Sequence, residues 1–361
     1  MSVRIIPPSR RLRFAPFLLV ATIVAGLALV ANRPLYPSYE TEEVTIGGNT
    51  MGGTWSVKLN WPTKKVPAGV MQSILQRHLD DINAALTTYD ETSPVRRFNA
   101  YRGGDWFPVP PHVVAAVLTG QQVSEQTGGA FDITVAPLVD LWGFGPKERG
   151  LRVGEIPADA AVTAARAHVD YRKLHARSDP PALRKDDPEL EVDLSGVGKG
   201  YAAGVLGQCL DNQSRYLIAV GGELRAKGLG LDGRPWPVGI EVPAPDTRRI
   251  LRTLELRDAG LSTSGDYRNF VDLAGRRYSH EIDPRTGRPI TGNLASVSIV
   301  HADSAYADAM ATGLMVLGRD EGYALAERLH LAVLFVTRGD GRFETRATPE
   351  FERLTVSNPL R

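Results

Sequence analysis

The stretch DLSGVGKGYAAGVLGQCL, residues 193–210, carries three glycines among its first eight residues and then becomes apolar. The glycines predict a turn, and the run after them predicts a helix over residues 201–210. The next apolar run, YLIAV at residues 216–220, predicts a strand directly after that helix. A glycine turn, a helix and a strand in such close succession are typical of a mixed α+β protein.

Helix and strand signals alternate in the same way along the rest of the chain. A strand over residues 54–59 precedes a helix that ends near Leu86, and a second helix begins at Pro111 and ends at Gly128. Further helices are expected over residues 158–169, 306–317 and 321–329, and further strands over residues 237–242, 295–300 and 331–336. Residues 152–188 form a polar, charged stretch in which only the first of those helices is expected. The prediction is an α+β fold with interleaved elements.

Composition excludes several classes of protein. The 361 residues carry 42 Lys and Arg against 41 Asp and Glu, and 43% are hydrophobic, which is ordinary for a folded globular chain. A net charge of +1 provides no general field for nucleic acid, so acidic ligands must be bound locally. Cys209 is the only cysteine, which excludes an intrachain disulfide and a multi-cysteine metal site.

The N-terminus has the pattern of an export signal or a membrane anchor. Four arginines precede an uncharged apolar run over residues 14–31, and a proline-containing linker follows it. The sequence leaves a cleaved signal and an uncleaved anchor both open. We therefore divide the chain into a leader, apolar helix and linker over residues 1–43 and one domain over residues 44–361. Either form of leader predicts a location at the inner membrane facing the periplasm, or in the periplasm.

Familiar hydrolase motifs do not fit this chain. The glycines around Lys199 suggest a phosphate loop, but that motif needs glycine at Asp193 and Ser or Thr at Gly200. The seven histidines include no pair with the spacing of a zinc protease helix, and no serine lies in a nucleophile elbow.

A series of short, chemically dense segments remains. In chain order they are Met51-Gly52-Gly53-Thr54, Thr88-Tyr89-Asp90, Gly129 to Thr134, Trp142 to Gly145, Asp193-Leu194-Ser195, Gly198-Lys199-Gly200, Gly221-Gly222-Glu223, Thr263 to Tyr267, His280, Asp283-Pro284, and Asp308-Ala309-Met310-Ala311-Thr312. In this order and spacing the chain resembles the ApbE family of FAD:protein FMN transferases over roughly Met51 to Gly318.

The last segment suggests a metal site. Asp308 and Thr312 are four residues apart, so on a helix a carboxylate and a hydroxyl share one face and can bind a hard cation. A helix cap or a solvated face is the alternative for such a pair. The resemblance implies a Mg²⁺ site made by Asp308, Thr312 and the backbone carbonyls of Gly196 and Ala311.

The glycine-rich segment suggests a phosphate site. Lys199 lies between two glycines just before the expected helix, where an ammonium and exposed amides could bind a pyrophosphate; a surface lysine is the alternative. Asp193 could bind a ribose or a base, or else cap a helix. The resemblance implies that both residues contact FAD. It also implies an acidic residue at Gly204, which this chain lacks.

Other positions are implied to hold the flavin end. By resemblance these are Met51, Tyr89 and the turn made by Ala130, Phe131 and Asp132, and a thioether and an aromatic ring suit a flat heteroaromatic ligand. Each could equally be core packing. Trp142 and Phe144 are expected to be core residues.

His280 is a candidate general base or phosphate ligand, with a structural hydrogen bond as the alternative. The resemblance implies a flavin contact at Ile282. Glu281, between them, departs from the apolar residue or Thr usual in the family.

The resemblance implies an enzyme that transfers FMN from FAD to a Ser or Thr hydroxyl of an exported acceptor flavoprotein and releases AMP, with Mg²⁺ as cofactor. Since the acceptor supplies the nucleophile, the enzyme needs none of its own. Two alternatives stay open: an FAD pyrophosphatase that gives FMN and AMP, and a non-catalytic FAD-binding protein.

Overall fold

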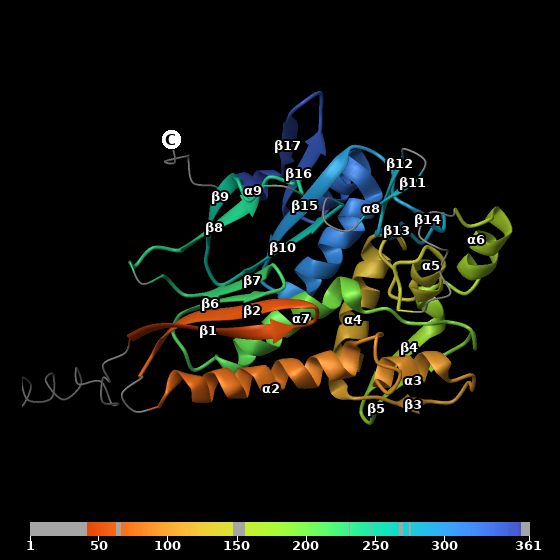
Figure 1. Ribbon diagram of the computed structural model, residues 1–361, viewed down its shortest axis with the longest axis horizontal. Helices are drawn as coiled ribbons and strands as arrows, with labels where there is room; N and C mark the ends of the chain where they lie inside the picture. Colours follow the sequence, from red (N-terminus) through yellow and green to blue (C-terminus); the bar gives the residue numbers. More distant parts are fainter. Residues whose placement is uncertain are drawn as a thin grey trace, which may run out of the picture. The chain divides into compact units, whose positions relative to one another are not determined.

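The computed structural model describes residues 42–62, 66–146, 156–230, 232–245, 247–266, 270–273 and 276–354 (Figure 1). The basic residues and the apolar run of the expected leader lie outside these residues. Within the described part of the chain, no helix combines the length and the apolar character that crossing a membrane requires. The described residues from Glu42 onward belong to one compact unit.

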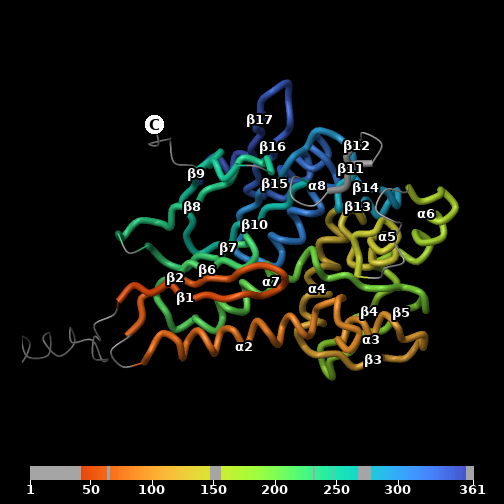
Figure 2. The backbone as a smooth tube through the Cα atoms, in the orientation of Figure 1, coloured from red at the N-terminus to blue at the C-terminus, as the bar shows by residue number. Residues whose placement is uncertain are grey.

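The centre of this unit is an antiparallel sheet of eight strands, in the order β1-β2-β6-β7-β10-β15-β16-β17. Strands β2 and β6 come from distant parts of the chain and lie side by side in Figure 2. In their pairing Trp55 is opposite Val220. The strand bounds are Glu42–Thr50, Gly53–Trp61, Tyr216–Val220, Glu223–Lys227, Gly260–Gly265, Leu294–His301, Ala332–Arg338 and Phe343–Ala347, in the same order.

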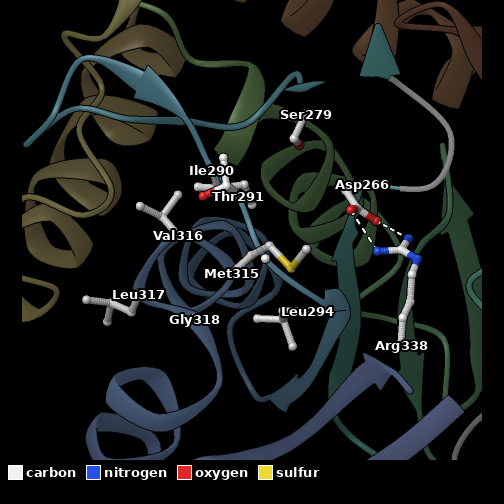
Figure 3. A pocket seen from close by; sticks show the side chains of 11 residues that line it. Asp266, Ser279, Ile290, Thr291, Leu294, Met315, Val316, Leu317, Gly318 and Arg338 are labelled. Atoms are coloured by element: carbon white, nitrogen blue, oxygen red, sulfur yellow. Dashed lines mark hydrogen bonds and ion pairs between the residues drawn. The ribbon is translucent and has the colours of Figure 1, made fainter. Parts of the chain in front are cut away.

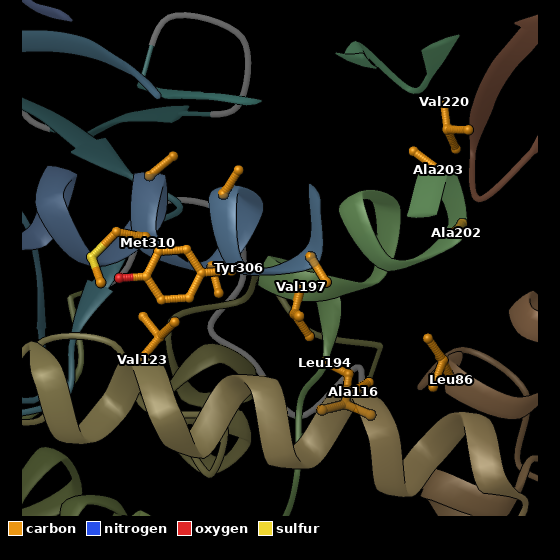
Figure 4. Close-up of a cluster of buried hydrophobic side chains, with 14 of the residues drawn as sticks. Leu86, Ala116, Val123, Leu194, Val197, Ala202, Ala203, Val220, Tyr306 and Met310 are labelled. Carbon is orange, nitrogen blue, oxygen red and sulfur yellow. The ribbon is translucent and has the colours of Figure 1, made fainter. Parts of the chain in front are cut away.

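Four long helices form the main core with the sheet. They are α2 (Ala68–Leu86), α4 (Pro111–Gln126), α7 (Ser195–Cys209) and α8 (Ser304–Arg328). Helices α2, α7 and α8 pack on one face of the sheet, and α4 packs against these three helices. Helix α7 packs on β6 and β7, whereas α8 packs on β10, β15 and β16 and also contacts α7 and α4. Figure 4 shows Val197 of α7 and Tyr306 and Met310 of α8 meeting above α4, where all three are buried. This core fixes α7 against α8.

The other face of the sheet carries a second apolar cluster. It is covered by the hairpin of β8 (Trp236–Glu241) and β9 (Ile250–Leu256) and by α9 (Pro349–Glu352), whose Phe351 is completely buried. Smaller elements surround the long helices: α3 (Pro94–Ala100), α5 (Ala136–Leu141), α6 (Asp159–Arg166), the 3-10 turn η1 (Tyr171–Lys173), β3 (Phe107–Pro108), β4 (Leu174–Ser178), β5 (Pro181–Lys185), β11 (Phe270–Leu273), β12 (Arg276–Ser279), β13 (Ile282–Asp283) and β14 (Arg288–Pro289).

The interleaved α+β prediction is confirmed, with three differences in detail. The helix expected over residues 201–210 begins at Ser195, so its glycines lie on the helix rather than in a turn before it. Strands β4 and β5 lie in the stretch expected to hold only a helix, because charged residues interrupt their apolar pattern. The two helices expected over residues 306–317 and 321–329 are the halves of α8, which breaks at Gly318 with φ of 80°.

Candidate functional site

The first turns of α7 approach the first turns of α8 very closely. A Cβ atom at Gly200 would overlap the carbonyl oxygen of Ser304 and would lie 2.6 Å from the Cβ of Asp308. One turn earlier on α7, a Cβ at Gly196 would lie 3.7 Å from the Oγ1 of Thr312. The lack of side chains on these glycines brings Asp308 and Thr312 next to the backbone of α7.

Asp308 is a buried carboxylate in the interior of α8. Only 4% of the residue is exposed, and Oδ2 accepts a hydrogen bond of 2.8 Å from the amide of Gly200. Burial and, after it, the negative charge of Glu223 raise the pKa of Asp308 to about 8, against the opposing effects of the Lys199 charge and the amide hydrogen bonds. Asp303, not Asp308, caps α8, by accepting the amide hydrogens of the next residues. The cap and solvated-face alternatives for Asp308 are therefore wrong.

The oxygen atoms around Asp308 fit a hard cation. Thr312 and Ser264 of β10 share a hydrogen bond of 3.0 Å between their hydroxyls, and Ala311 is completely buried beside Thr312. In the described ranges no three His, Cys, Asp or Glu side chains gather at one point. A cation here would therefore depend on one carboxylate, a hydroxyl and backbone oxygens, a donor set that suits Mg²⁺. The Mg²⁺ ligands expected from the sequence, Asp308, Thr312 and the carbonyls of Gly196 and Ala311, stay a prediction.

Lys199 and Glu223 form an ion pair beside Asp308. The Nζ of Lys199 lies 3.2 Å from the Oε1 of Glu223, and Glu223 is 3% exposed. Lys199 is in the second turn of α7, so the expected turn before the helix is wrong; the helix continues through it because the flanking glycines allow close packing. The side chain of Lys199 is half-exposed, but its ammonium pairs with a buried carboxylate. The alternative of a surface lysine is therefore wrong.

Met51 lies at the tip of the β1–β2 hairpin, in an unusual backbone conformation. Its φ is 48° and that of Gly52 is 72°, so both central residues of this two-residue turn have the positive φ of a type I′ hairpin. Behind the turn, Gly53 comes close to Gly221, whose amide donates to the carbonyl of Thr54 at 2.9 Å. A Cβ at Gly221 would in turn lie 2.9 Å from the Cδ of Lys199. Met51 is thus brought to the Lys199 side of α7.

Tyr89 and Asp193 lie near the N-terminal end of α7. Tyr89 is 74% exposed, and its pKa is raised by partial burial and by the negative charges of Asp193 and Asp140. The Oδ1 of Asp193 accepts a hydrogen bond of 2.8 Å from the amide of Ser195. Leu194, however, is the N-cap of α7, and the helix has no side-chain cap, so the capping alternative for Asp193 is wrong. The exposed tyrosine ring and a half-buried carboxylate border the same end of the helix.

The turn made by Ala130, Phe131 and Asp132 is buried. The Asp132 carboxylate accepts hydrogen bonds from the amide and hydroxyl of Thr134 and from the amide of Tyr171, and burial raises its pKa. A Cβ at Gly196 would lie 2.9 Å from the ring of Phe131. Phe131 therefore lies next to Gly196 at the start of α7, whereas the Asp132 carboxylate orders its own loop.

His280 and Ile282 lie in the segment between β12 and β14. His280 is half-buried, with its ring edge-to-face against Phe144 at a centroid distance of 6.4 Å. Ile282 is buried in a third apolar cluster with Leu138 and Trp142. The expected core role of Trp142 is confirmed, and the indole also donates a hydrogen bond to the carbonyl of Gly287. Ile282 is part of this cluster and is not in the core that surrounds α7.

A cavity of about 760 Å³ begins just beyond Asp308 and Thr312 (Figure 3). Met315 lines it one turn after Thr312 on α8. Asp266, which directly follows β10, also lines it and is paired with Arg338. Ser279, adjacent to His280, lies on another wall. The size of this cavity is typical of a ligand site, and polar and apolar residues both line it. Its other lining residues are Ile290, Thr291, Gly292, Leu294, Val316, Leu317 and Gly318.

The structure adds two residues to those expected from the sequence. Glu223 pairs with Lys199, and Ser264 hydrogen-bonds Thr312. Both belong to segments noted in the sequence, but only sheet pairing brings them to α8. Alternate residues of a strand share a face, so the sequence of β10 indicates that Ser262 and Ser264 lie on the same side of the sheet. This alternation is the signal by which Ser264 could have been found.

Comparison with known proteins agrees with this geometry. Residues 51–335 match the model of the ApbE family. The chain is 38% identical over 313 residues to the FAD:protein FMN transferase of Vibrio cholerae, covering 86% of this chain and 92% of the relative. It is also 38% identical over 348 residues to the FAD:protein FMN transferase of Escherichia coli, covering 94% of this chain and 98% of the relative.

Solved structures show the same likeness in three dimensions. The flavin transferase ApbE from Vibrio cholerae superimposes with a TM-score of 0.78 at 37% identity, over 87% of this chain and 100% of that chain. The apo form of the flavinyl transferase ApbE from Pseudomonas stutzeri superimposes with a TM-score of 0.79 at 37% identity, over 89% of this chain and 99% of that chain.

Proposed function

This chain belongs to the ApbE family and is an FAD:protein FMN transferase, and we propose that it moves FMN to a Ser or Thr hydroxyl of its acceptor protein with the help of Mg²⁺. The main support for the metal, and for the location of the reaction, is the buried carboxylate of Asp308. Together with Thr312 it faces the start of α7. The acceptor supplies the nucleophile, so the site needs no serine or cysteine nucleophile of its own.

In this proposal the acceptor hydroxyl oxygen forms a bond to the phosphorus of the FMN part. The bond from that phosphorus to the AMP oxygen breaks, and AMP leaves with the bonding electron pair. Bound Mg²⁺ would supply positive charge for the pyrophosphate and the leaving AMP. Asp308, Thr312 and the carbonyls of Gly196 and Ala311 would hold it.

The remaining groups orient the substrates and move the proton. Lys199 projects its ammonium beside Asp308, where it can bind a pyrophosphate oxygen. We assign His280 as the base that accepts the proton of the acceptor hydroxyl, since it is half-buried and adjoins a residue that lines the cavity. Met51, Tyr89 and Phe131, which surround the first turns of α7, are assigned to FAD.

We assign the cavity beyond Thr312 to the acceptor polypeptide. An in-line displacement needs the nucleophile and the leaving group on opposite sides of the phosphorus. The residues assigned to FAD surround the start of α7, while the cavity extends from Thr312 in the other direction along α8. A segment of the acceptor seated there would present its hydroxyl from the side opposite to AMP.

The leader supports a location outside the cytoplasm. We infer from the basic residues and the apolar run over residues 14–31 that the domain faces the periplasm, where exported flavoproteins are its acceptors. Fusing residues 1–43 to a reporter enzyme that is active only after export tests this, and an inactive fusion would contradict it. The size of the fused reporter in the membrane and soluble fractions distinguishes a retained anchor from a cleaved signal.

Mass spectrometry of the reaction products tests the proposed function. The domain is incubated with FAD, Mg²⁺ and an exported flavoprotein that carries a Ser or Thr acceptor site. Transfer adds the mass of FMN less one water to the acceptor, and a chelator prevents it. Free FMN and AMP with an unmodified acceptor would instead indicate a pyrophosphatase, and intact bound FAD would indicate a storage protein.

A further inference from the structure

Two buried oxygen atoms without a hydrogen-bond partner lie on the sheet beneath α8. They are Oε2 of Glu223 and Oγ of Ser262. Strands β7 and β10 pair with Gly260 opposite Arg225 and Leu261 opposite Leu224, and the next step of this register brings Ser262 beside Glu223. Residues directly opposite each other in an antiparallel pair share a face of the sheet. The two unpartnered oxygens therefore belong to one polar spot.

This polar spot faces Asp308. A Cβ at Gly260 would lie 2.6 Å from the Oγ of Ser304, and the hydroxyl of Ser264 bonds that of Thr312. Residues 260, 262 and 264 point to the same side of β10, and Asp308 lies midway between residues 304 and 312 on α8.

Lys199 lies next to both carboxylates. Its ammonium is 3.2 Å from Oε1 of Glu223, and Lys199 directly precedes Gly200, whose amide donates to the Oδ2 of Asp308 at 2.8 Å. The β6–β7 turn restricts the path of the Lys199 side chain, since Gly221 has φ of 57° and a Cβ there would lie 2.9 Å from the Cδ of Lys199. An ammonium paired fully with Asp308 would compete with a cation for the same oxygens.

We propose that Glu223 is a positioning residue, which holds the ammonium of Lys199 off Asp308 and so keeps the Asp308 carboxylate open to a divalent cation. This inference rests on the proposed function, because it takes Asp308 as a metal ligand. In this role the buried glutamate after the Gly221-Gly222 turn controls the competition between Lys199 and the metal for Asp308. It makes no direct contact with FAD or the acceptor.

Calorimetric titration of the protein with Mg²⁺, without FAD, tests the role of Glu223. Glu223→Gln keeps the size of the side chain but releases the ammonium toward Asp308. We expect the Kd for Mg²⁺ to rise about tenfold. Asp211→Asn is the matched control, since it removes the carboxylate of another lysine–carboxylate pair of 3.2 Å, at Lys227, and should leave the Kd unchanged.

A double variant separates positioning from a direct effect of the carboxylate. Glu223→Gln combined with Lys199→Met removes the competing ammonium as well, so the Kd for Mg²⁺ should return to within about twofold of the parent value. A Kd that stays high would show that Glu223 binds the cation itself or attracts it by its own charge, and would overturn the positioning role. Glu223→Asp, which keeps the charge on a shorter side chain, should give an intermediate Kd.

The controls distinguish failure of this inference from failure of the proposed function. If the parent protein neither binds Mg²⁺ nor transfers FMN, the metal assignment fails. If the parent does both and Glu223→Gln binds Mg²⁺ equally well, only the role of Glu223 fails. Should the glutamine variant not fold, as judged by circular dichroism, the aspartate variant decides: an unchanged Kd for Mg²⁺ contradicts the proposal.

Discussion

At the scale of single residues, the buried side chain of Asp308 sets the properties of the site. A carboxylate that is 4% exposed has lost most of its contact with water, so its charge needs other groups to stabilise it. In the structure these are the amide of Gly200 and a nearby ammonium. A bound cation would complete that compensation. The same burial that makes the residue costly when uncompensated makes its attraction for a cation strong.

We expect Asp308→Asn to lower FMN transfer by at least about 100-fold, because it removes the charge that holds the cation and leaves the shape unchanged. Mass spectrometry of the acceptor measures the loss, and circular dichroism checks the fold. Asp303→Asn is the control, because asparagine can still cap α8. Full transfer by the Asp308 variant with Mg²⁺ present would rule out the metal assignment.

Glu281 gives a prediction about pH. Burial and the nearby charge of Asp266 raise the pKa of Glu281 to about 8. In the unfolded chain it loses its proton near its ordinary pKa, whereas the folded protein keeps the proton until about pH 8. Between these two pKa values unfolding therefore releases a proton from Glu281. The contribution of Glu281 to the free energy of unfolding is complete at low pH and is lost as the pH rises toward 8.

Glu281→Gln should remove this dependence. Between pH 5 and pH 8 the free energy of unfolding of the parent should fall by roughly 3 kcal/mol more than that of the glutamine variant. Urea unfolding at the two pH values measures the difference, and Glu91→Gln, at an exposed position, should behave like the parent. Parallel changes in the parent and the Glu281 variant would show that the residue is ionised in the folded protein.

The sequence predicts the chemistry of single residues better than their surroundings. Asp308 and Thr312 are four residues apart in the sequence, so their shared helix face follows directly. Their burial and their contacts with Gly200 and Ser264 depend on elements more than forty residues away, and no local pattern carries that information. Glu223 was missed as a site residue for this reason, since its partner Lys199 lies on another element.

At the scale of elements, the contact between α7 and α8 decides the site. A helix rich in glycine is weak by itself, because each glycine costs about 1 kcal/mol relative to alanine. The sequence therefore predicted a turn where α7 begins. Close packing against α8 compensates for the weak propensity at Gly196 and Gly200, which only the fold reveals.

Two glycines of α7 should respond to substitution in opposite ways. A Cβ at Gly204 meets no atom within 4 Å, so Gly204→Ala should stabilise the protein by about 0.5–1 kcal/mol through helix propensity. A Cβ at Gly200 would overlap Ser304 and approach Asp308, so Gly200→Ala should destabilise by about 1–3 kcal/mol. Thermal unfolding compares the two, and equal effects would contradict the packing of α7 on α8.

At the scale of the whole molecule, the site lies where the sheet, α7 and α8 meet and continues into the cavity. Interleaved signals were enough to predict the α+β class, since strands such as β6 and β15 are apolar runs. The strand order could not be predicted, because pairings such as Trp55 with Val220 join distant segments. The cavity likewise depends on residues from β10, α8 and β16 together.

Narrowing the cavity should affect the acceptor and not FAD. Thr291 is exposed at the cavity wall, so Thr291→Trp can partly fill the space without disturbing the core. We expect the KM for the acceptor to rise about tenfold while the Kd for FAD changes less than about twofold. Thr286→Trp, an exposed position nearby that does not line the cavity, is the control. Weaker binding of FAD instead would assign the cavity to the flavin.

The pairing of β2 with β6 also bears on how the protein forms. It connects segments nearly half the chain apart, and Asp308 and Thr312 of α8 come later still. Contacts between distant segments slow folding, because a large loop must close before they form. The residues of the proposed site therefore cannot come together before α8 has been synthesised and has packed on the sheet. A nascent chain that stops before α8 lacks these residues, so we expect it to be unable to transfer FMN.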